Sequence, residues 1–227
     1  MEDPINPRIF ENGRLIKNIN LQLLAPGGDE IGRGAFGVVI KTKYAGTPVA
    51  VKKMLNPSIE GVQNLQLELG ALSALSHPNI VNFIAFDSQY IVMPMADGNF
   101  KATEEQNITT KELAIVGLDC MRGLAYMHMH GDGNGRCIMH GDLKPDNILV
   151  YRSEKNEQNR RPIYKAMLGD VGLAKICNVY RNYKYTGTPG FMHTPDSDHP
   201  ISPYDDIAAL AVSLLDAPYI KNTFLDE

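Results

Sequence analysis

Apolar and polar positions follow different patterns in the first and second parts of the chain. Between Ile31 and Val51, β-branched residues gather in two runs on either side of Gly46. Such runs, bounded by Gly and Pro, predict antiparallel strands. The leucines at positions 65, 69, 72 and 75 recur at spacings of three and four, which predicts one face of an amphipathic helix. That helix is expected to end at His77, because the residue before a proline is steered away from the α region.

Helical patterns dominate the second part. Thr109 and Glu112 have the spacing of a capping box, so a long helix is expected to begin near Thr109 and to end near Gly131. Short strands are expected across residues 137–150, and a further helix at Asp206–Leu215. Strands first and helices afterwards indicate an α+β fold with two lobes. We expect an extension over residues 1–25, a small strand-rich N-lobe with one helix over about 26–96, and a helical C-lobe over about 97–227.

Composition and charge exclude several classes of protein. Of the 227 residues, 44 % are apolar and 21 % are charged, which is ordinary for a globular protein. Lys and Arg number 22 against 26 Asp and Glu, a net charge of −4, and there is no basic block. Nucleic acid is therefore not an expected partner. The longest apolar stretch, residues 207–215, is far shorter than the roughly 20 residues that span a bilayer.

The cysteines and the amino terminus bear on the cellular compartment. Cys120, Cys137 and Cys177 show no CxxC spacing, which fits free thiols in a reducing compartment better than a disulfide framework or a zinc site. The first residues, MEDPINPRIF, lack the features of a secretory signal. We therefore expect a cytoplasmic protein without a membrane span.

A glycine-rich segment and a lysine suggest a phosphate site. Gly32, Gly34 and Gly37 form the pattern G-x-G-x-x-G, which alone is weak evidence. Strand residues follow it, and Lys52 and its neighbour stand where a dinucleotide-binding turn would have an acid, so the glycines favour a loop that lies over phosphates. Lys52 ends an apolar strand, and Glu68 on the predicted helix is its expected second partner. A ligand-free hairpin and a surface lysine are the alternatives at this point.

The most informative segment is residues 139–149, MHGDLKPDNIL. It places Asp142, Lys144 and Asn147 within six residues of one another. A carboxylate accepts the proton of a hydroxyl, a lysine neutralises a phosphoryl group, and an amide oxygen binds a hard cation. Asp170, followed by Val171 and a glycine, supplies a second carboxylate suited to Mg²⁺. These are the parts that in-line phosphoryl transfer requires.

In this order, the motifs resemble those of the eukaryotic-type protein kinases, and the resemblance extends from about Ile31 to Leu215. It implies transfer of the γ-phosphoryl group of ATP, with Mg²⁺, to serine or threonine hydroxyls of protein substrates, and signalling partners. The family's nucleotide site maps onto Ile31, Gly32, Gly34, Gly37, Val39, Ala50, Lys52, Met93, Ala96 and Leu149. Lys52 would pair with Glu68, Asp142 would be the base and Lys144 the γ-phosphate contact. Asn147 and Asp170 would hold the metal.

Further positions resemble known parts of the family. Thr188 lies in a GTPGF segment that resembles the substrate-positioning loop, close to Asp142 and Lys144, and Asp206 would brace the catalytic loop. Gly141 replaces the usual arginine, with Ile138 before it, as in the Pelle and interleukin-receptor-associated kinases. From this replacement we expect activity without phosphorylation of Thr186 or its neighbours.

Other departures support an alternative. Val171 stands in place of the usual Phe, and MHTPD at residues 192–196 stands in place of M-A-P-E. The chain ends about ten residues after Leu215, whereas members of the family continue with more helices, so a shortened C-lobe is expected. The alternative is a truncated pseudokinase that binds nucleotide or sequesters a partner. The intact catalytic residues favour the enzyme.

Overall fold

The computed structural model describes residues 10–11, 14–15, 19–33, 37–55, 75–87, 89–104, 108–130, 136–152, 164–171, 175–178, 188–191 and 202–215. The chain divides into two compact units. The first comprises Met1–Ser76 and Val81–Met95, and the second comprises His77–Ile80 and Ala96–Glu227. Strands build the described part of the first unit, and both strands and long helices build the second, so the predicted α+β class is confirmed.

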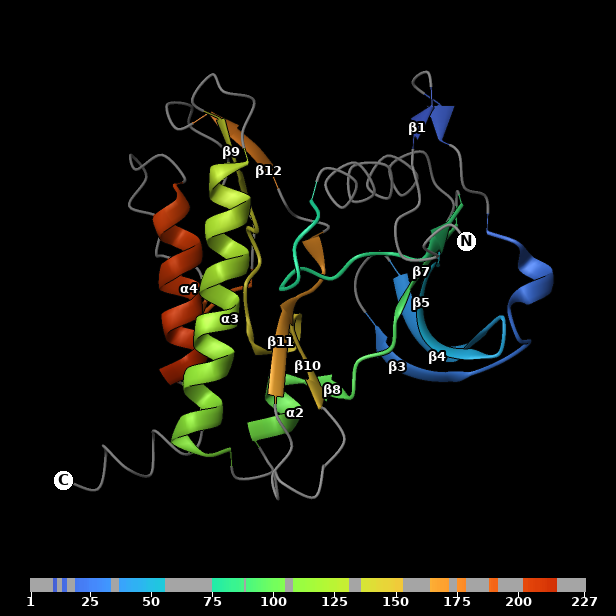
Figure 1. The fold of residues 1–227 in the computed structure, drawn as a ribbon, viewed down its shortest axis with the longest axis horizontal. Coiled ribbons are helices and arrows are strands. Elements are labelled where there is room, and N and C mark those ends of the chain that lie inside the picture. Colours follow the sequence, from blue (N-terminus) through green and yellow to red (C-terminus); the bar gives the residue numbers. More distant parts are fainter. Residues whose placement is uncertain are drawn as a thin grey trace. The chain divides into compact units, whose positions relative to one another are not determined.

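The first unit is built on a five-stranded antiparallel sheet of order β3-β4-β5-β7-β6 (Figure 1). Its strands are β3 (Asp29–Arg33), β4 (Gly37–Tyr44), β5 (Thr47–Met54), β6 (Ala85–Phe86) and β7 (Tyr90–Pro94). The predicted hairpin around Gly46 is confirmed as a tight connection of β4 to β5. Ala45 and Gly46 both have positive φ, 49° and 83°, which matches the twist of the flanking strands.

The two faces of this sheet differ in burial. Val49 and Val51 on β5 are buried in a cluster with Ile19, Ala85 and Val92. Successive side chains of a strand point to opposite faces, so the residues between those valines lie on the other face. One face of the sheet is therefore the core of this unit, and the other carries residues of mixed character.

Residues 19–25, which the sequence assigns to a terminal extension, pack onto this core. Ile19 is 6 % exposed, and its N–H donates to the carbonyl of Phe86 over 2.9 Å. The N–H of Ala25 donates to the carbonyl of Lys43 over 2.9 Å. A short 3-10 helix, η1 (Leu21–Leu23), lies between these contacts, and a two-stranded ribbon precedes it, β1 (Phe10–Glu11) with β2 (Arg14–Leu15). These residues are thus part of the first unit's packing.

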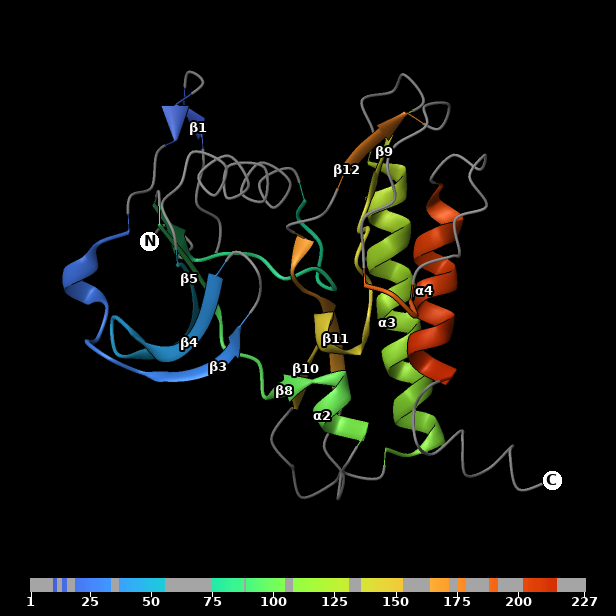
Figure 2. The same ribbon diagram turned by 180° about the vertical axis from the view of Figure 1, so that it is seen from behind.

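The second unit places two helices beside short sheets. Helices α3 (Thr110–Met129) and α4 (Pro203–Leu215) run side by side, as Figures 1 and 2 both show. The remaining elements are β8 (Gly98–Asn99), α2 (Phe100–Glu104), β9 (Arg136–Met139), η2 (Pro145–Asn147), β10 (Ile148–Arg152), β11 (Tyr164–Leu168) and β12 (Lys175–Asn178). Strands β11, β10 and β8 form one antiparallel sheet, and β9 pairs with β12.

Helix α3 confirms the predicted capping box. The N–H of Glu112 donates to Thr109 Oγ1 over 3.3 Å, and the N–H of Thr109 donates to Glu112 Oε2 over 2.7 Å. These bonds satisfy two donors that a helix start otherwise leaves without partners. The buried side includes the apolar residues Val116, Cys120, Leu124 and Met127.

Gly123 lies at a close approach of α3 to its neighbours. A Cβ there would lie 2.9 Å from the carbonyl oxygen of Asn79 and 2.9 Å from a methyl group of Leu168. The Asn79 amide also donates to the carbonyl of Ala166 on β11 over 2.9 Å. Helix α3 therefore sits directly against the strand that leads to Asp170.

Several predicted features fall outside the described residues. They are the leucine-rich helix with Glu68, the loop residue Gly34, the segment with Tyr185 and Thr186, and residues 192–196. Among the helices that the structure describes, none is long and apolar enough to cross a membrane.

Candidate active site

The loop that carries the predicted catalytic residues is held at both ends by buried strands. It leaves β9 after Met139 and enters β10 at Ile148, and both residues are buried. Within the loop, Leu143 is 2 % exposed, and its buried side chain anchors the middle of the segment. Polar side chains on either side of Leu143 are thereby turned toward one place, as the alternation of apolar anchors and polar residues predicts.

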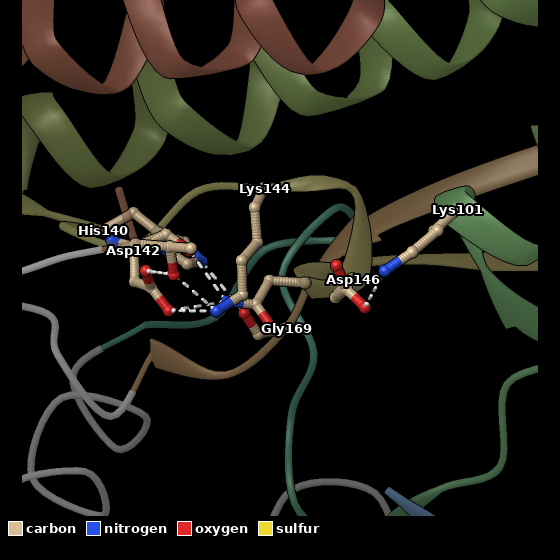
Figure 3. Close-up of polar contacts among 8 residues, drawn as sticks. Lys101, His140, Asp142, Lys144, Asp146 and Gly169 are labelled. Atoms are coloured by element: carbon tan, nitrogen blue, oxygen red, sulfur yellow. Dashed lines mark hydrogen bonds and ion pairs between the residues drawn. The ribbon is translucent and has the colours of Figure 1, made fainter. Parts of the chain in front are cut away.

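Asp142, Lys144 and Thr188 form a closed triangle of polar contacts. Lys144 Nζ lies 2.9 Å from Asp142 Oδ2, and it donates to Thr188 Oγ1 over 2.7 Å. The Thr188 hydroxyl in turn donates to Asp142 Oδ1 over 2.6 Å. The side chain of Asp142 is 10 % exposed and that of Lys144 is 22 % exposed. The Thr188 hydroxyl is thus held between a proton acceptor and a positive charge, and Figure 3 shows the contact of Lys144 with Asp142.

Asn147 holds the backbone and the carboxylate of Asp142 together. Its Nδ2 donates to the Asp142 carbonyl over 2.7 Å and to Asp142 Oδ2 over 3.2 Å. Since both bonds use the amide nitrogen, the amide oxygen points elsewhere. Asn147 is 7 % exposed, so its orientation is fixed by its surroundings.

His140 joins this loop to the segment before Asp170. Its ring is fully buried, and its Nε2 lies 2.9 Å from the carbonyl oxygen of Gly169. A carbonyl only accepts hydrogen bonds, so Nε2 carries the proton. The ring's Nδ1 then accepts the N–H of Asp142 over 3.4 Å. A further bond, from the Gly169 N–H to the Asn147 carbonyl over 2.8 Å, completes the link.

The oxygens of Asn147 and Asp170 suit a hard cation. Asp170 is exposed and has a positive φ of 50°, which is uncommon outside glycine and directs this residue out of the strand that precedes it. An amide oxygen and a carboxylate are ligands that Mg²⁺ prefers, and it keeps several waters besides. Groups of three or more His, Cys, Asp or Glu with metal-site geometry do not occur in the described part of the chain. The donor types of Asn147 and Asp170 therefore fit Mg²⁺.

Asp206 braces the start of the loop, as predicted. Its Oδ2 accepts the His140 N–H over 2.9 Å, and its Oδ1 accepts the Gly141 N–H over 3.0 Å. His128 Nε2, at the end of α3, lies 2.8 Å from Oδ2. Burial opposes ionisation of Asp206, but the His128 hydrogen bond and the backbone N–H donors of Gly141 and His140 outweigh it and lower the pKa of Asp206 below its ordinary value.

Predicted nucleotide residues of the first unit share one face of its sheet. In the register, Val39 lies opposite both Gly32 and Lys52, and Ala50 lies opposite Met93. Paired residues and residues two apart project to the same face. This is the face opposite the buried valines of β5. Of the other predicted contacts, Ile31 is 47 % exposed at the edge strand β3, and Leu149 and Ala96 belong to the second unit.

Two contacts of the site region carry no signal in the sequence. His128 reads as a basic residue at the end of a helix, and only its approach to Asp206 shows what it binds. Lys101 on α2 lies 3.6 Å from Asp146, which directly precedes Asn147 (Figure 3). Sequence spacing gives no indication of either pair, because each joins separate elements.

Comparisons with known proteins agree on one family. The family model described as the protein kinase domain matches residues 27–220. The serine/threonine-protein kinase VIK of Arabidopsis thaliana is 32 % identical over 174 residues, which are 70 % of this chain and 37 % of that protein. A probable serine/threonine-protein kinase of Dictyostelium discoideum is 34 % identical over 178 residues, 74 % of this chain and 27 % of that protein. A probable LRR receptor-like serine/threonine-protein kinase of Arabidopsis thaliana is 30 % identical over 170 residues, 70 % of this chain and 29 % of that protein. The chain thus spans well under half of the length of these relatives.

Proposed function

The chain belongs to the protein kinase domain family, and on this premise we propose that it transfers the γ-phosphoryl group of ATP to serine or threonine hydroxyls of a protein substrate. The observation that carries the proposal is the triangle of Asp142, Lys144 and Thr188, in which a hydroxyl is held 2.6 Å from a carboxylate oxygen and 2.7 Å from a lysine nitrogen. A substrate hydroxyl that attacks phosphorus needs both of these groups.

In the proposed reaction, Asp142 accepts the proton of the substrate hydroxyl. The hydroxyl oxygen forms a bond to the γ-phosphorus, the bond from that phosphorus to the β–γ bridging oxygen breaks, and ADP leaves. Lys144 offsets negative charge on the transferred group. Stabilising this charge and positioning the reactants account for most of the catalysis of phosphoryl transfer. Asn147 keeps the Asp142 carboxylate in one orientation through its two donated bonds.

We assign ATP binding to the shared face of the first unit. The resemblance to the kinases adds Leu149 and Ala96 of the second unit to the nucleotide contacts. Gly32, Gly34 and Gly37 would approach the phosphates, and Lys52 would contact them and pair with Glu68. The side-by-side register of Gly32, Val39 and Lys52 supports this assignment. Ile31, Ala50 and Met93 would contact the adenine.

We assign the metal to Asn147 and Asp170. When bound, Mg²⁺ would neutralise the charge of the β- and γ-phosphates. The link through Gly169 and His140 supports this assignment, because it ties the segment of Asp170 to the loop of Asn147 by hydrogen bonds of 2.8 and 2.9 Å.

We also place the chain with the Pelle and interleukin-receptor-associated kinases, on Gly141 and Ile138. The glycine leaves the loop without the arginine that would bind a phosphate on the activation segment. This supports activity that does not depend on phosphorylation of Thr186 or its neighbours.

A transfer assay tests the proposal. The purified chain is incubated with radiolabelled ATP, Mg²⁺ and a generic protein substrate, and wild type is compared with Asp142→Asn. Loss of a general base lowers the rate by about 10²- to 10⁴-fold, while ATP–Mg²⁺ should still raise the Tm of the variant. Asp87→Asn makes the same chemical change in a turn of the first unit and should retain activity, because its Oδ1 still accepts the turn's N–H groups.

Two results would overturn the proposal. Equal rates of Asp142→Asn and wild type would remove Asp142 from the chemistry. Nucleotide binding by wild type without any transfer above the Asp142→Asn background would favour the alternative of a pseudokinase that regulates a partner.

A further inference from the structure

The register of β9 and β12 brings two distant cysteines together. The strands form a two-stranded antiparallel sheet and lie side by side in both views (Figures 1 and 2). Cys177 is the direct partner of Cys137, and the neighbouring pairs are Ile176 with Ile138 and Asn178 with Arg136. The two cysteines are 40 positions apart in sequence, so spacing alone gives no reason to pair them.

Directly opposed residues have the separation that a disulfide needs. In an antiparallel pair, opposed Cα atoms lie about 4.5 or 5.5 Å apart, depending on the hydrogen-bonding position. Disulfides bridge Cα atoms roughly 4.4–6.8 Å apart, and both separations lie in that range. A disulfide also brings the Cβ atoms to about 3.5–4.5 Å, which the non-hydrogen-bonded position approaches most closely, so closure requires at most a small local adjustment of the strands. Cys137 is a free thiol in this structure.

We propose that Cys137 and Cys177 are a dithiol–disulfide pair that glutathione disulfide oxidises. One cysteine thiolate attacks a sulfur of glutathione disulfide, which releases one glutathione and leaves a mixed disulfide. The opposed cysteine then attacks the protein sulfur of that bond and releases the second glutathione. The protein loses two protons and two electrons, and glutathione disulfide gains them.

The bond would close a loop around the proposed catalytic residues. Asp142, Asn147 and Asp170 all lie between the two cysteines in sequence. The cross-link would hold β9, which leads into the catalytic loop, and β12, which follows Asp170, in the register that they already have. A disulfide stabilises the folded state mainly by reducing the entropy of the unfolded chain. For a closed loop of roughly 40 residues, this increase in stability is substantial.

The exchange should be slow. Cys137 is 5 % exposed, so reaction requires local opening of the strand pair. Burial, and next to it the negative charge of Asp206, raises the pKa of the Cys137 thiol and reduces the fraction of reactive thiolate. We expect oxidation over minutes to hours, the usual range for uncatalysed disulfide rearrangement.

Peptide mapping tests the pairing directly and needs no activity. The full chain is incubated with glutathione disulfide, free thiols are alkylated, and a tryptic digest is analysed without reduction. Cleavage after Arg136 and Lys175 yields a Cys137 peptide of residues 137–152 and a Cys177 peptide of residues 176–181. The expected result is one cross-linked product of these two peptides that dithiothreitol separates, with Cys120 alkylated in its own peptide.

Thermal unfolding gives a second readout. Oxidised wild type should unfold roughly 5–15 °C above reduced wild type. Cys177→Ser should show no such rise, whereas Cys120→Ser should keep it. The proposal is overturned if both cysteines carry glutathione without a cross-link, if the bonds join separate chains, or if the Cys177→Ser variant gains the same Tm.

Discussion

Replacing Asp206 tests whether its buried carboxylate holds the start of the catalytic loop. Asp206 is 2 % exposed, and its carboxylate accepts the N–H groups of His140 and Gly141 and contacts His128. In Asp206→Asn, one oxygen still accepts at the Oδ2 position, but an NH₂ group faces the Gly141 N–H. One buried donor loses its acceptor, which costs about 1–3 kcal/mol of the free energy of unfolding. Asp206→Ala leaves all three donors without an acceptor and should cost about 3–5 kcal/mol.

Urea unfolding of the three proteins measures these losses, and Asp205→Asn is the matched control. Asp205 lies beside Asp206 in the first turn of α4, so both changes remove the same charge from the same helix end. The Asp205 carboxylate accepts the Ser202 N–H over 2.7 Å, and an asparagine oxygen accepts it equally well. We expect a loss below about 1 kcal/mol in this control.

The pH dependence gives the decisive result. The folded-state pKa of Asp206 is lowered from its ordinary value of 3.8, so ionised Asp206 contributes stability above that pH and the contribution is lost as pH falls through the lowered pKa. The difference in unfolding free energy between wild type and Asp206→Asn should therefore be constant from pH 5 upward and shrink below roughly pH 4. Equal losses in Asp206→Asn and Asp205→Asn, or a difference that grows in acid, would refute the reasoning.

The remaining predictions concern packing, the triangle and the helix cap. Gly123→Ala should lower the free energy of unfolding by about 1–2 kcal/mol in urea titration, since its Cβ meets a backbone carbonyl at 2.9 Å; Gly117→Ala, which meets only a side-chain methyl at 3.2 Å, should be neutral or stabilising. Thr188→Ala should lower kcat/KM roughly 10- to 100-fold in the transfer assay by removing the hydroxyl between Asp142 and Lys144, and Thr188→Ser should restore it. Thr109→Ala should cost about 1 kcal/mol and Thr109→Ser nearly nothing, as thermal unfolding will show.

The sequence predicted those elements well whose backbone is determined by residues close together in the chain. The capping box at Thr109 and Glu112 fixed the start of α3, and the glycine at 46 fixed the hairpin of β4 and β5. In both cases the residues within one turn of the chain determine the backbone, so no distant contact was needed. The start of α4 was harder to predict: the helix is expected from Asp206, where the apolar stretch is about to begin, but it starts at Pro203.

Contacts between distant segments required the structure. The motif order predicted that Thr188 lies close to Asp142, and in the structure the Thr188 hydroxyl oxygen lies 2.6 Å from Asp142 Oδ1. The partnership of His128 with Asp206 and the opposition of Cys137 and Cys177 could not be predicted, because each depends on how whole elements are packed or registered. Residues 19–25 gave little periodicity, yet Ile19 is buried, since one apolar residue suffices to join a core.

The backbone at Gly141 bears on which residues this loop can accept. Its φ of 77° lies in the left-handed region, where any residue with a Cβ pays about 1–2 kcal/mol and glycine pays nothing. A chain with arginine at this position must recover that strain from another interaction, whereas here the loop rests in a relaxed conformation that Asp206 already holds through the Gly141 N–H. Gly141→Arg should therefore lower the free energy of unfolding by about 1–2 kcal/mol unless a new interaction of the arginine offsets the strain.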